Sequence, residues 1–476
     1  MIDLLVTGGA VLTADAADTY IPDGAVAIEA GRIVAVGSAT ELGTRYPAAP
    51  TLDARGCLVL PGLVNAHAHS AMTLFRGRAD DVDLQVFLER LVAAESAVLS
   101  AEVVRVAVRL ALAESIRAGV TTAMDMYWFP EAGLAAAAEA GFRLVTGPTF
   151  MDVPGPPDGL DFAARLRRAA ESLARSAGDR ASAHAVPTRC VTPHSTYTLN
   201  PDQLLAVGEL AREHDALLHI HAAENAVEVA GVRERYGRRP VELLHDLGLL
   251  RPGTLLAHAV HLTDEEIALV AASGAGVAHC PVSNLKLASG VARLPELLAA
   301  GVPVGLGTDG AVSANTLDLF GPIRAAATLH RVTPGGAPDP TLIGARTALR
   351  MATADGARAI GIGALTGSIE VGKAADLVVL DLNRPHLTPR HDPWSMLAYA
   401  AGPADVRDTV IDGRIVMRDR RLLTIDEGAA IEDLNALAAT LPNPSGRPGR
   451  APDPNDTGSA PSREGASGVS ASGIST

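Results

Sequence analysis

The feature that most constrains the fold is a unit repeated along the middle of the chain: a short apolar run followed by a longer stretch of helical period. Eight such runs occur, namely LVNAHAH, VTTAMDM, RLVTGPTF, AHAVPTRCVTPH, ALLHIHAAE, TLLAHAVH, GAGVAHCP and VPVGLGTDG. A strand followed by a helix, repeated along the chain, predicts a parallel sheet. Eight of these units in about 300 residues predict a (β/α)8 TIM-type barrel over residues 61–362.

The two ends of the chain differ from the middle. Residues 1–60 and 363–430 carry short β-branched runs separated by Gly, Asp and Pro, which predict strands and turns. Because the two segments are alike, we expect a small β-sandwich-like domain built from both chain ends, which makes the fold class α/β. Residues 442–476 are rich in Pro, Gly, Ser and Asp, so we expect a disordered tail there.

Charge and cysteine content exclude several classes of function. The chain has 40 basic and 54 acidic residues, a net charge of −14, which argues against partners such as nucleic acid or an anionic membrane. The three cysteines are widely spaced and form no Cys-x-x-Cys pair, so neither a disulfide framework nor a thiolate zinc site is expected. The N-terminal segment lacks a basic region before an apolar run, and we expect a cytoplasmic protein.

Polar residues close several of the eight runs. His67 and His69 stand two apart, so on a strand their side chains project from the same face. The pair alone is a weak signal, because histidines are often ordinary interior residues. Further runs end in, or are followed by, His194, His221, His258 and Asp309. The carboxyl ends of barrel strands converge on one mouth, where the active sites of this fold are built.

Three imidazoles and one carboxylate of this set suit Zn²⁺ or Fe²⁺ and leave a position open for water. These four are His67, His69, His221 and Asp309. Glu224 lies three residues after His221 and can reach over the mouth as a proton carrier. A glutamate is also favoured in a first helical turn, which is the alternative for Glu224. We expect His219 to face the layer between barrel and helices as an interior residue.

Seven segments in a fixed order carry a resemblance to a known family. They are PGLVNAHAHSAMTLFRG, TPHSTYT, HIHAAE, AHAVHL, HCPVSNLKLASG, LGTDG and TGSIEVGKAADLVVLD. Together they resemble the metal-dependent amidohydrolase superfamily. More narrowly, they are similar to its aminohydrolase and chlorohydrolase branch, which includes methylthioadenosine/S-adenosylhomocysteine deaminase, guanine deaminase and the triazine hydrolases. The resemblance covers roughly residues 1 to 430.

The resemblance implies roles for individual residues. It implies one divalent metal ion per subunit, Zn²⁺ first and Fe²⁺ as the alternative, held by His67, His69, His221 and Asp309. It implies that Glu224 shuttles protons, that His258 positions or polarises the attacking water, and that Asp309 acts with them in catalysis. His194 matches a histidine that contacts the substrate, and the resemblance implies that Glu224 and His258 contact it as well. Glu95 falls where ribose hydroxyls are recognised. A homo-oligomer is implied as well.

We therefore predict a hydrolytic deaminase of an amino-substituted N-heterocycle, a small molecule of the adenosine type, that releases ammonia. One alternative is a guanine-type or pterin-type base, and another is a triazine-like ring that loses chloride or an alkylamine. A third alternative belongs to a different class, a non-catalytic relative that uses the barrel as a scaffold. Such a scaffold need not retain the four metal ligands, the proton shuttle Glu224 and the water-positioning His258. All six of these residues are present here.

Overall fold

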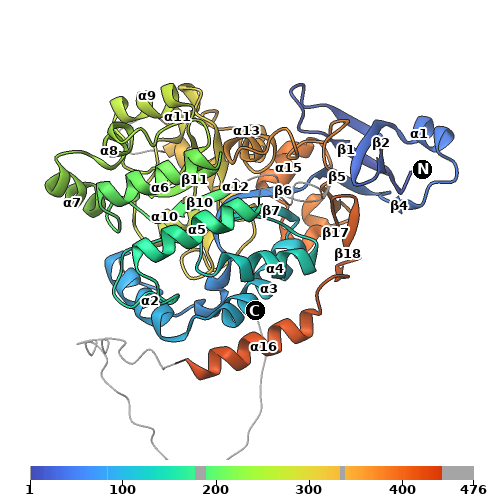
Figure 1. Ribbon diagram of the computed structural model, residues 1–476. Helices are drawn as coiled ribbons and strands as arrows, with labels where there is room; N and C mark the ends of the chain where they lie inside the picture. Colours follow the sequence, from blue (N-terminus) through green and yellow to red (C-terminus); the bar gives the residue numbers. More distant parts are fainter. Residues whose placement is uncertain (1, 83, 177–188, 333–337, 442–476) are drawn as a thin grey trace, which may run out of the picture. The chain divides into compact units, whose positions relative to one another are not determined.

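The computed structural model describes residues 2–82, 84–176, 189–332 and 338–441, which form strands and helices in alternation (Figure 1). The tail predicted at residues 442–476 lies outside the described residues. Among the described helices, none combines the length and the apolar character needed to cross a lipid bilayer.

A mixed sheet of nine strands takes strands from both ends of the chain, in the order β19-β18-β17-β16-β5-β1-β2-β3 with β4 beside β1. Its strands are β1 (Leu4–Leu12), β2 (Tyr20–Glu29), β3 (Arg32–Ser38), β4 (Thr51–Asp53), β5 (Cys57–Pro61), β16 (Leu377–Asp381), β17 (Val406–Ile411), β18 (Arg414–Arg418) and β19 (Arg421–Leu422). The two ends join where β5 and β16 run antiparallel, with Val59 opposite Val379. Both valines belong to one buried core, so each end covers apolar surface of the other.

The middle of the chain forms two parallel sheets. The six-stranded sheet has the order β14-β13-β12-β11-β10-β9, and the four-stranded sheet has the order β15-β6-β7-β8. Their strands are β6 (Leu63–His69), β7 (Val120–Asp125), β8 (Arg143–Val145), β9 (Thr149–Phe150), β10 (Cys190–Pro193), β11 (Leu217–Ala222), β12 (Thr254–His258), β13 (Gly276–His279), β14 (Val304–Leu306) and β15 (Asp309–Gly310). Each of the eight predicted runs contains at least one of these strands. The α/β class with parallel strands is therefore confirmed.

Two glycines mark the places where the chain passes from one parallel sheet to the other. Gly147 lies between β8 and β9, and a Cβ atom added there would lie 1.7 Å from the carbonyl oxygen of Cys190. Gly307 lies between β14 and β15, where an added Cβ would lie 2.9 Å from Cβ of His67. Only a residue without a side chain allows the strands to approach so closely. The glycine at residue 307 thereby brings Asp309 close to His67.

Helices make the connections between the parallel strands. Those that follow β6 to β10 are η1 (Ser70–Phe75), α2 (Leu84–Val98), α3 (Ala101–Arg117), α4 (Pro130–Ala140), α5 (Phe162–Ser176) and α6 (Pro201–Glu213). Those that follow β11 to β15 are α7 (Ala226–Tyr236), α8 (Pro240–Asp246), α9 (Asp264–Ser273), α10 (Pro281–Lys286), α11 (Leu294–Ala299), α12 (Phe320–Leu329), η2 (His330–Val332), α13 (Ala345–Met351) and α14 (Ala354–Ala359). The remaining helices are α1 (Ala39–Arg45), η3 (Pro385–Leu387), α15 (Pro393–Tyr399), η4 (Pro403–Asp405) and α16 (Glu427–Thr440).

Helix α3 illustrates why these segments are helical. Its buried residues include Val104, Ala107, Val108 and Ala111, whose spacing of three or four places them on one face. The side chain of Ser100 accepts a hydrogen bond from the Val103 N–H and caps the first turn. The apolar face therefore packs inward while the polar face meets solvent.

Candidate active site

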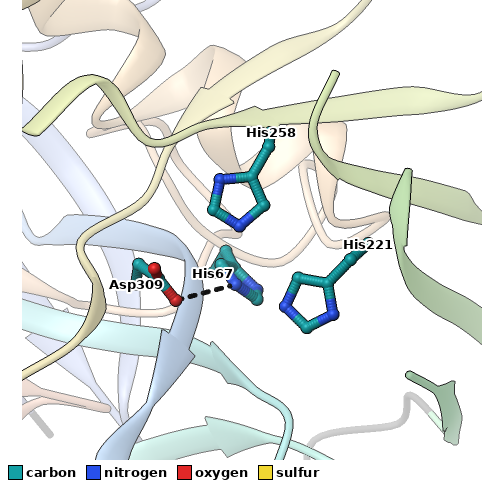
Figure 2. Close-up of side chains that lie close together, drawn as sticks. All are labelled: His67, His221, His258 and Asp309. Atoms are coloured by element: carbon teal, nitrogen blue, oxygen red, sulfur yellow. Dashed lines mark ion pairs between the residues drawn. The ribbon is translucent and has the colours of Figure 1, made fainter. Parts of the chain in front are cut away.

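The carboxyl ends of the parallel strands bring the predicted polar residues together. His67 and His69 lie at the end of β6, His221 near the end of β11, His258 at the end of β12, and Asp309 at the start of β15. One ligand atom from each of four of them, His67, His221, His258 and Asp309, lies within 4.8 Å of the others, and all four residues are buried. Figure 2 shows these side chains pointing toward a common centre.

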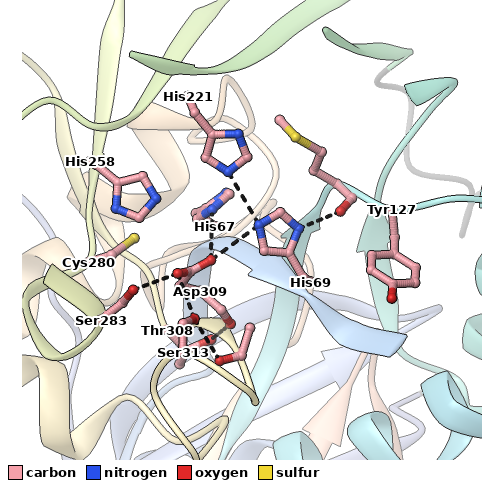
Figure 3. Close-up of polar contacts among 12 residues, drawn as sticks. His67, His69, Tyr127, His221, His258, Cys280, Ser283, Thr308, Asp309 and Ser313 are labelled. Atoms are coloured by element: carbon pink, nitrogen blue, oxygen red, sulfur yellow. Dashed lines mark hydrogen bonds and ion pairs between the residues drawn. The ribbon is translucent and has the colours of Figure 1, made fainter. Parts of the chain in front are cut away.

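His69 belongs to the same cluster (Figure 3). Its Nε2 atom lies 3.2 Å from Oδ1 of Asp309 and 3.3 Å from Nε2 of His221. The Nε2 atom of His67 lies 3.3 Å from the same Asp309 oxygen. The structure thus places all four residues predicted as metal ligands around one point, and adds His258 to them.

Hydrogen bonds behind the cluster orient three of the imidazoles. In each case the ring Nδ1 atom contacts an oxygen. Nδ1 of His69 lies 2.6 Å from the Met126 carbonyl oxygen, and Nδ1 of His221 lies 2.8 Å from the His194 carbonyl oxygen. Nδ1 of His258 lies 2.8 Å from Oδ1 of Asn284. A carbonyl oxygen can only accept, so Nδ1 carries a proton and Nε2 faces the cluster. This is the outer-shell pattern of metal-binding histidines.

The fourth imidazole is oriented by a residue that the sequence reasoning assigned wrongly. Nδ1 of His67 lies 2.9 Å from Nε2 of His219, and both rings are buried. The prediction that His219 faces the layer between barrel and helices is wrong, because His219 and His221 are two apart on β11 and their side chains share a face. The two-residue spacing that singled out His67 and His69 would have identified it.

Asp309 is held as an ionised carboxylate. Its Oδ2 atom accepts hydrogen bonds from the hydroxyls of Ser283 at 2.6 Å and Ser313 at 2.7 Å, which leaves Oδ1 toward the imidazoles. Burial acts to raise the pKa of Asp309, but the imidazoles of His67 and His69 outweigh it and hold the pKa well below its usual value. Asp309 and His258 both have a positive φ, 64° and 71°, a rare conformation for such residues that clusters at functional sites.

The donor set fits a divalent metal ion. Nε2 of His67 is buried and has no hydrogen-bond partner, and the Nε2 atoms of His69 and His221 face each other. Burial lowers the pKa of His67 to about 3 and that of His221 well below its usual value, so both rings are neutral, as metal ligands must be. Burial also opposes charge on His69, yet Asp309 raises the pKa of His69 to about 9. The centre therefore attracts a cation, and nitrogen and carboxylate donors suit Zn²⁺ or Fe²⁺.

Glu224 follows β11 and lies beside the cluster. Its carboxyl group is buried, and one of its oxygens lies 4.0 Å from Nε2 of His258. Burial raises the pKa of Glu224, so the side chain can hold a proton nearer neutral pH than an exposed glutamate. Glu224 thus lies at the edge of the centre, within reach of a molecule bound there.

Glu228 fixes the turn that carries Glu224, and the sequence reasoning did not identify it. The buried Glu228 carboxylate accepts the backbone N–H groups of Ala223 at 3.0 Å and of Glu224 at 2.7 Å. Burial, followed by the neighbouring Glu224 charge, raises the pKa of Glu228 to about 7. The signal that could have found it is a glutamate three residues after Asn225, the spacing of a helix-capping box.

A cavity opens over the cluster and includes the predicted substrate contacts. It encloses about 660 Å³ free of protein atoms, counted to its open mouth, and is lined by Glu95, His194, Glu224 and His258 among others. The carboxyl group of Glu95 accepts the Tyr127 hydroxyl at 2.6 Å, and burial raises the pKa of Glu95 to about 7. A concave site lined by apolar side chains with a few converging polar groups is typical of small-molecule binding.

These observations define an α/β protein with a buried imidazole and carboxylate centre at the carboxyl ends of its parallel strands, the class of metal-dependent hydrolases. The chain belongs to the amidohydrolase family, whose sequence profile matches residues 58–416. A second profile, the imidazolonepropionase-like composite domain of bacteria, matches residues 24–49.

Comparison with individual proteins agrees with this assignment. The chain is 45% identical over 446 residues to 5-methylthioadenosine/S-adenosylhomocysteine deaminase of Syntrophobacter fumaroxidans, with 92% of this chain and 98% of that protein covered. It is 38% identical over 441 residues to 5'-deoxyadenosine deaminase of Methanosarcina mazei, with coverage of 93% and 99%. Among solved structures, a zinc-bound adenosine deaminase of Xanthomonas campestris has a TM-score of 0.86, 37% identity, and coverage of 92% and 98%.

Proposed function

We propose that this chain is a metal-dependent hydrolytic deaminase of an adenosine-type compound, and that it releases ammonia. One observation carries the proposal: the metal-type centre, the raised-pKa glutamate Glu224 and the ribose-type acceptor Glu95 all line one cavity. Relatives that deaminate 5'-modified adenosines, at 38% to 45% identity over nearly the whole chain, support the substrate type.

We assign the metal ligands to His67, His69, His221 and Asp309, and we propose one Zn²⁺ ion per subunit because the related solved structure holds zinc. A divalent ion bound there would lower the pKa of water from about 16 to about 7 and so supply a nucleophile at neutral pH. His258, whose Nδ1 contacts Asn284, turns its Nε2 toward the cluster, where it can orient the attacking water.

The side chains of the protein account for the proton movements. Glu224 donates a proton to a nitrogen of the substrate ring, which makes the adjacent amino-bearing carbon electrophilic. Asp309 accepts a proton from the attacking water, because its carboxylate is ionised and its Oδ2 is fixed by two serines. That proton passes to the amino group, the remaining hydroxyl proton returns to the ionised Glu224, and the C–N bond breaks, so that the amino-bearing ring and water become a ring carbonyl and ammonia.

Glu95 and His194 position the substrate in this proposal. An ionised Glu95 can accept two ribose hydroxyls, and the Tyr127 hydroxyl holds its carboxyl group in place. His194 lies directly after β10, and its Nδ1 is 3.2 Å from the hydroxyls of both Ser195 and Thr198. The opposite ring edge of His194 is therefore available to the substrate base.

We further propose that the two parallel sheets together close an eightfold barrel over residues 61–362. Within each sheet, runs that follow one another along the chain are paired. The third run passes from the four-stranded to the six-stranded sheet at Gly147, and the eighth run passes back at Gly307. The nine-stranded sheet is proposed as the small β-sandwich-like domain of residues 1–60 and 363–430, which its own core and the composite-domain match support. A homo-oligomer and a cytoplasmic location stay predictions.

The test is ammonia release by the metal-reconstituted protein from adenosines, guanine, pterins and triazines. Adenosines should give the highest kcat/KM, and activity on none of the compounds would contradict the proposed function. Asp309→Asn should lose both bound metal and turnover because it removes a charged ligand. Glu224→Gln should keep its metal but lose turnover, whereas unchanged ammonia release would contradict the proton-carrier role.

A further inference from the structure

We propose that the cavity selects adenosine-type substrates whose 5′ substituent is uncharged and apolar, and that it discriminates against an amino-acid extension carrying a carboxylate. The inference rests on the proposed function and narrows it. It separates 5'-methylthio compounds from S-adenosylhomocysteine, which the name of one relative groups together, and places 5'-deoxy compounds with the former.

The first observation is an apolar wall that begins beside Glu95. Helix α2 presents Leu84, Phe87, Leu88, Leu91 and Val92 to the cavity, at the spacings of three and four that define one helical face, and Glu95 is the next residue on that face. From Glu95 to Leu84 this face extends about 16 Å along the helix axis. A substituent that leaves the ribose along this wall meets hydrocarbon.

The second observation is the charge of the lining. The ionisable residues of the described lining are three carboxylic acids, those of Glu95, Glu224 and Asp309, together with imidazoles and the phenols of Tyr127 and Tyr197. No lysine or arginine lines the cavity in the described part of the chain. A substrate carboxylate that lies along the apolar wall would therefore lose its hydration without gaining a lysine or arginine partner.

The third observation concerns a buried arginine beside the cavity wall. Arg165 is buried behind Trp128, with its guanidinium 5.2 Å from the Trp128 ring. Its Nε and Nη2 atoms bind the two oxygens of Asp158 at 2.9 Å and 2.7 Å, and its Nη1 donates to the Met151 carbonyl at 3.2 Å. The charge of Arg165 is thus neutralised, and its donors support the cavity wall instead of opening into it.

Two further arginines line adjoining hollows. Arg168 lines one that shares only Trp128 and Thr149 with the cavity. Arg235 lines another that shares only Leu88 and Tyr197 with it. Neither Arg168 nor Arg235 lines the cavity itself.

The experiment compares kcat/KM for four substrates with the full, metal-loaded chain: 5'-deoxyadenosine, 5'-methylthioadenosine, the uncharged 5'-butylthioadenosine and S-adenosylhomocysteine. The butyl compound matches the length of the amino-acid extension without its charges. We expect the first three values to agree within about tenfold and the fourth to be at least about 100-fold lower, because a buried carboxylate lacks a partner.

Comparable kcat/KM values for S-adenosylhomocysteine and 5'-methylthioadenosine would overturn the inference while leaving the proposed function intact. Rejection of the butyl compound together with S-adenosylhomocysteine would also overturn it, because length would then be the cause. Deamination of none of the four would overturn the proposed function itself, and the inference with it.

Variants at Leu88 test the same reasoning on the protein side. Leu88→Arg places a cation in the wall and should raise the ratio of kcat/KM for S-adenosylhomocysteine to that for 5'-methylthioadenosine by at least about tenfold. The matched uncharged variant Leu88→Met should leave that ratio unchanged. Equal ratios in both variants would contradict the role of charge. A loss of S-adenosylhomocysteine activity in Arg168→Ala or Arg235→Ala would show that a cation already serves the extension, which would overturn the inference.

Discussion

Replacing Glu228 with alanine tests whether this carboxylate positions Glu224. In the folded protein Glu228 accepts the N–H groups of Ala223 and Glu224, at 3.0 Å and 2.7 Å, and so fixes the turn in which Ala223 has a φ of 54°. Glu228 itself is 5% exposed, so alanine would leave both N–H groups without a protein acceptor in a buried place. We expect the turn to relax and the Glu224 carboxyl group to move away from the substrate ring.

The magnitude follows from these two bonds. A buried N–H left unsatisfied costs about 1–3 kcal/mol, so two of them lower the free energy of unfolding by about 2–6 kcal/mol. The lower part of this range is expected, because the pKa of Glu228 is raised to about 7 and its ionised form is itself costly to bury. A displacement of about 1 Å at a reacting group lowers kcat by about 100-fold. That factor corresponds to about 2.7 kcal/mol in the activation free energy.

The assay measures kcat for ammonia release, metal content and the free energy of unfolding in urea for the same preparations. Glu242→Ala is the matched control, because Glu242 accepts the Arg239 N–H at 2.9 Å in the equivalent capping position of α8, away from the cavity. Both variants should lose stability, and only Glu228→Ala should also lose kcat with its metal retained. Wild-type kcat in Glu228→Ala, with lowered stability alone, would refute the positioning role.

Two more predictions concern the centre and the cavity. Ser283→Ala and Ser313→Ala each remove one hydrogen bond from Oδ2 of Asp309, so each should weaken metal affinity by at least about tenfold in a chelator competition; unaltered affinity would contradict the support role. Burial raises the pKa of Glu95 to about 7, so its carboxyl group gains a proton as the pH falls through 7 and accepts ribose hydroxyls less well. KM for a ribose-bearing substrate should therefore rise below pH 7 in the wild type. KM of Glu95→Gln should be higher than that of the wild type and independent of pH across this range. Parallel pH profiles of KM for the two proteins would refute the assignment.

The sequence was sufficient to predict the parts of this protein that follow from periodicity along the chain. Alternation on β6 places His67 and His69 on one face, and the strand ends at His221, His258 and Asp309 follow because parallel strands end at one edge of a sheet. These regularities are local, so they can be recognised without knowing how the segments pack.

Other features depend on contacts between segments far apart in the chain. His67 and His219 are separated by 152 residues, and only their packing makes one orient the other. The hydrogen bond from Ser283 to Asp309 is of the same kind, because these residues are 26 apart in the chain and a hydrogen bond requires atoms about 3 Å apart.

The sequence by itself determined the order of the eight strand-containing runs and the residue types of the proposed metal centre and proton carrier, since each of these follows from spacing along one segment. The tertiary structure alone decided which oxygens and nitrogens orient the ligands, how the apolar face of α2 walls the cavity, and that the described lining contains no arginine or lysine. The physical reason is that spacing fixes the direction of a side chain, whereas partners, burial and charge environment are set by which surfaces meet when the chain folds.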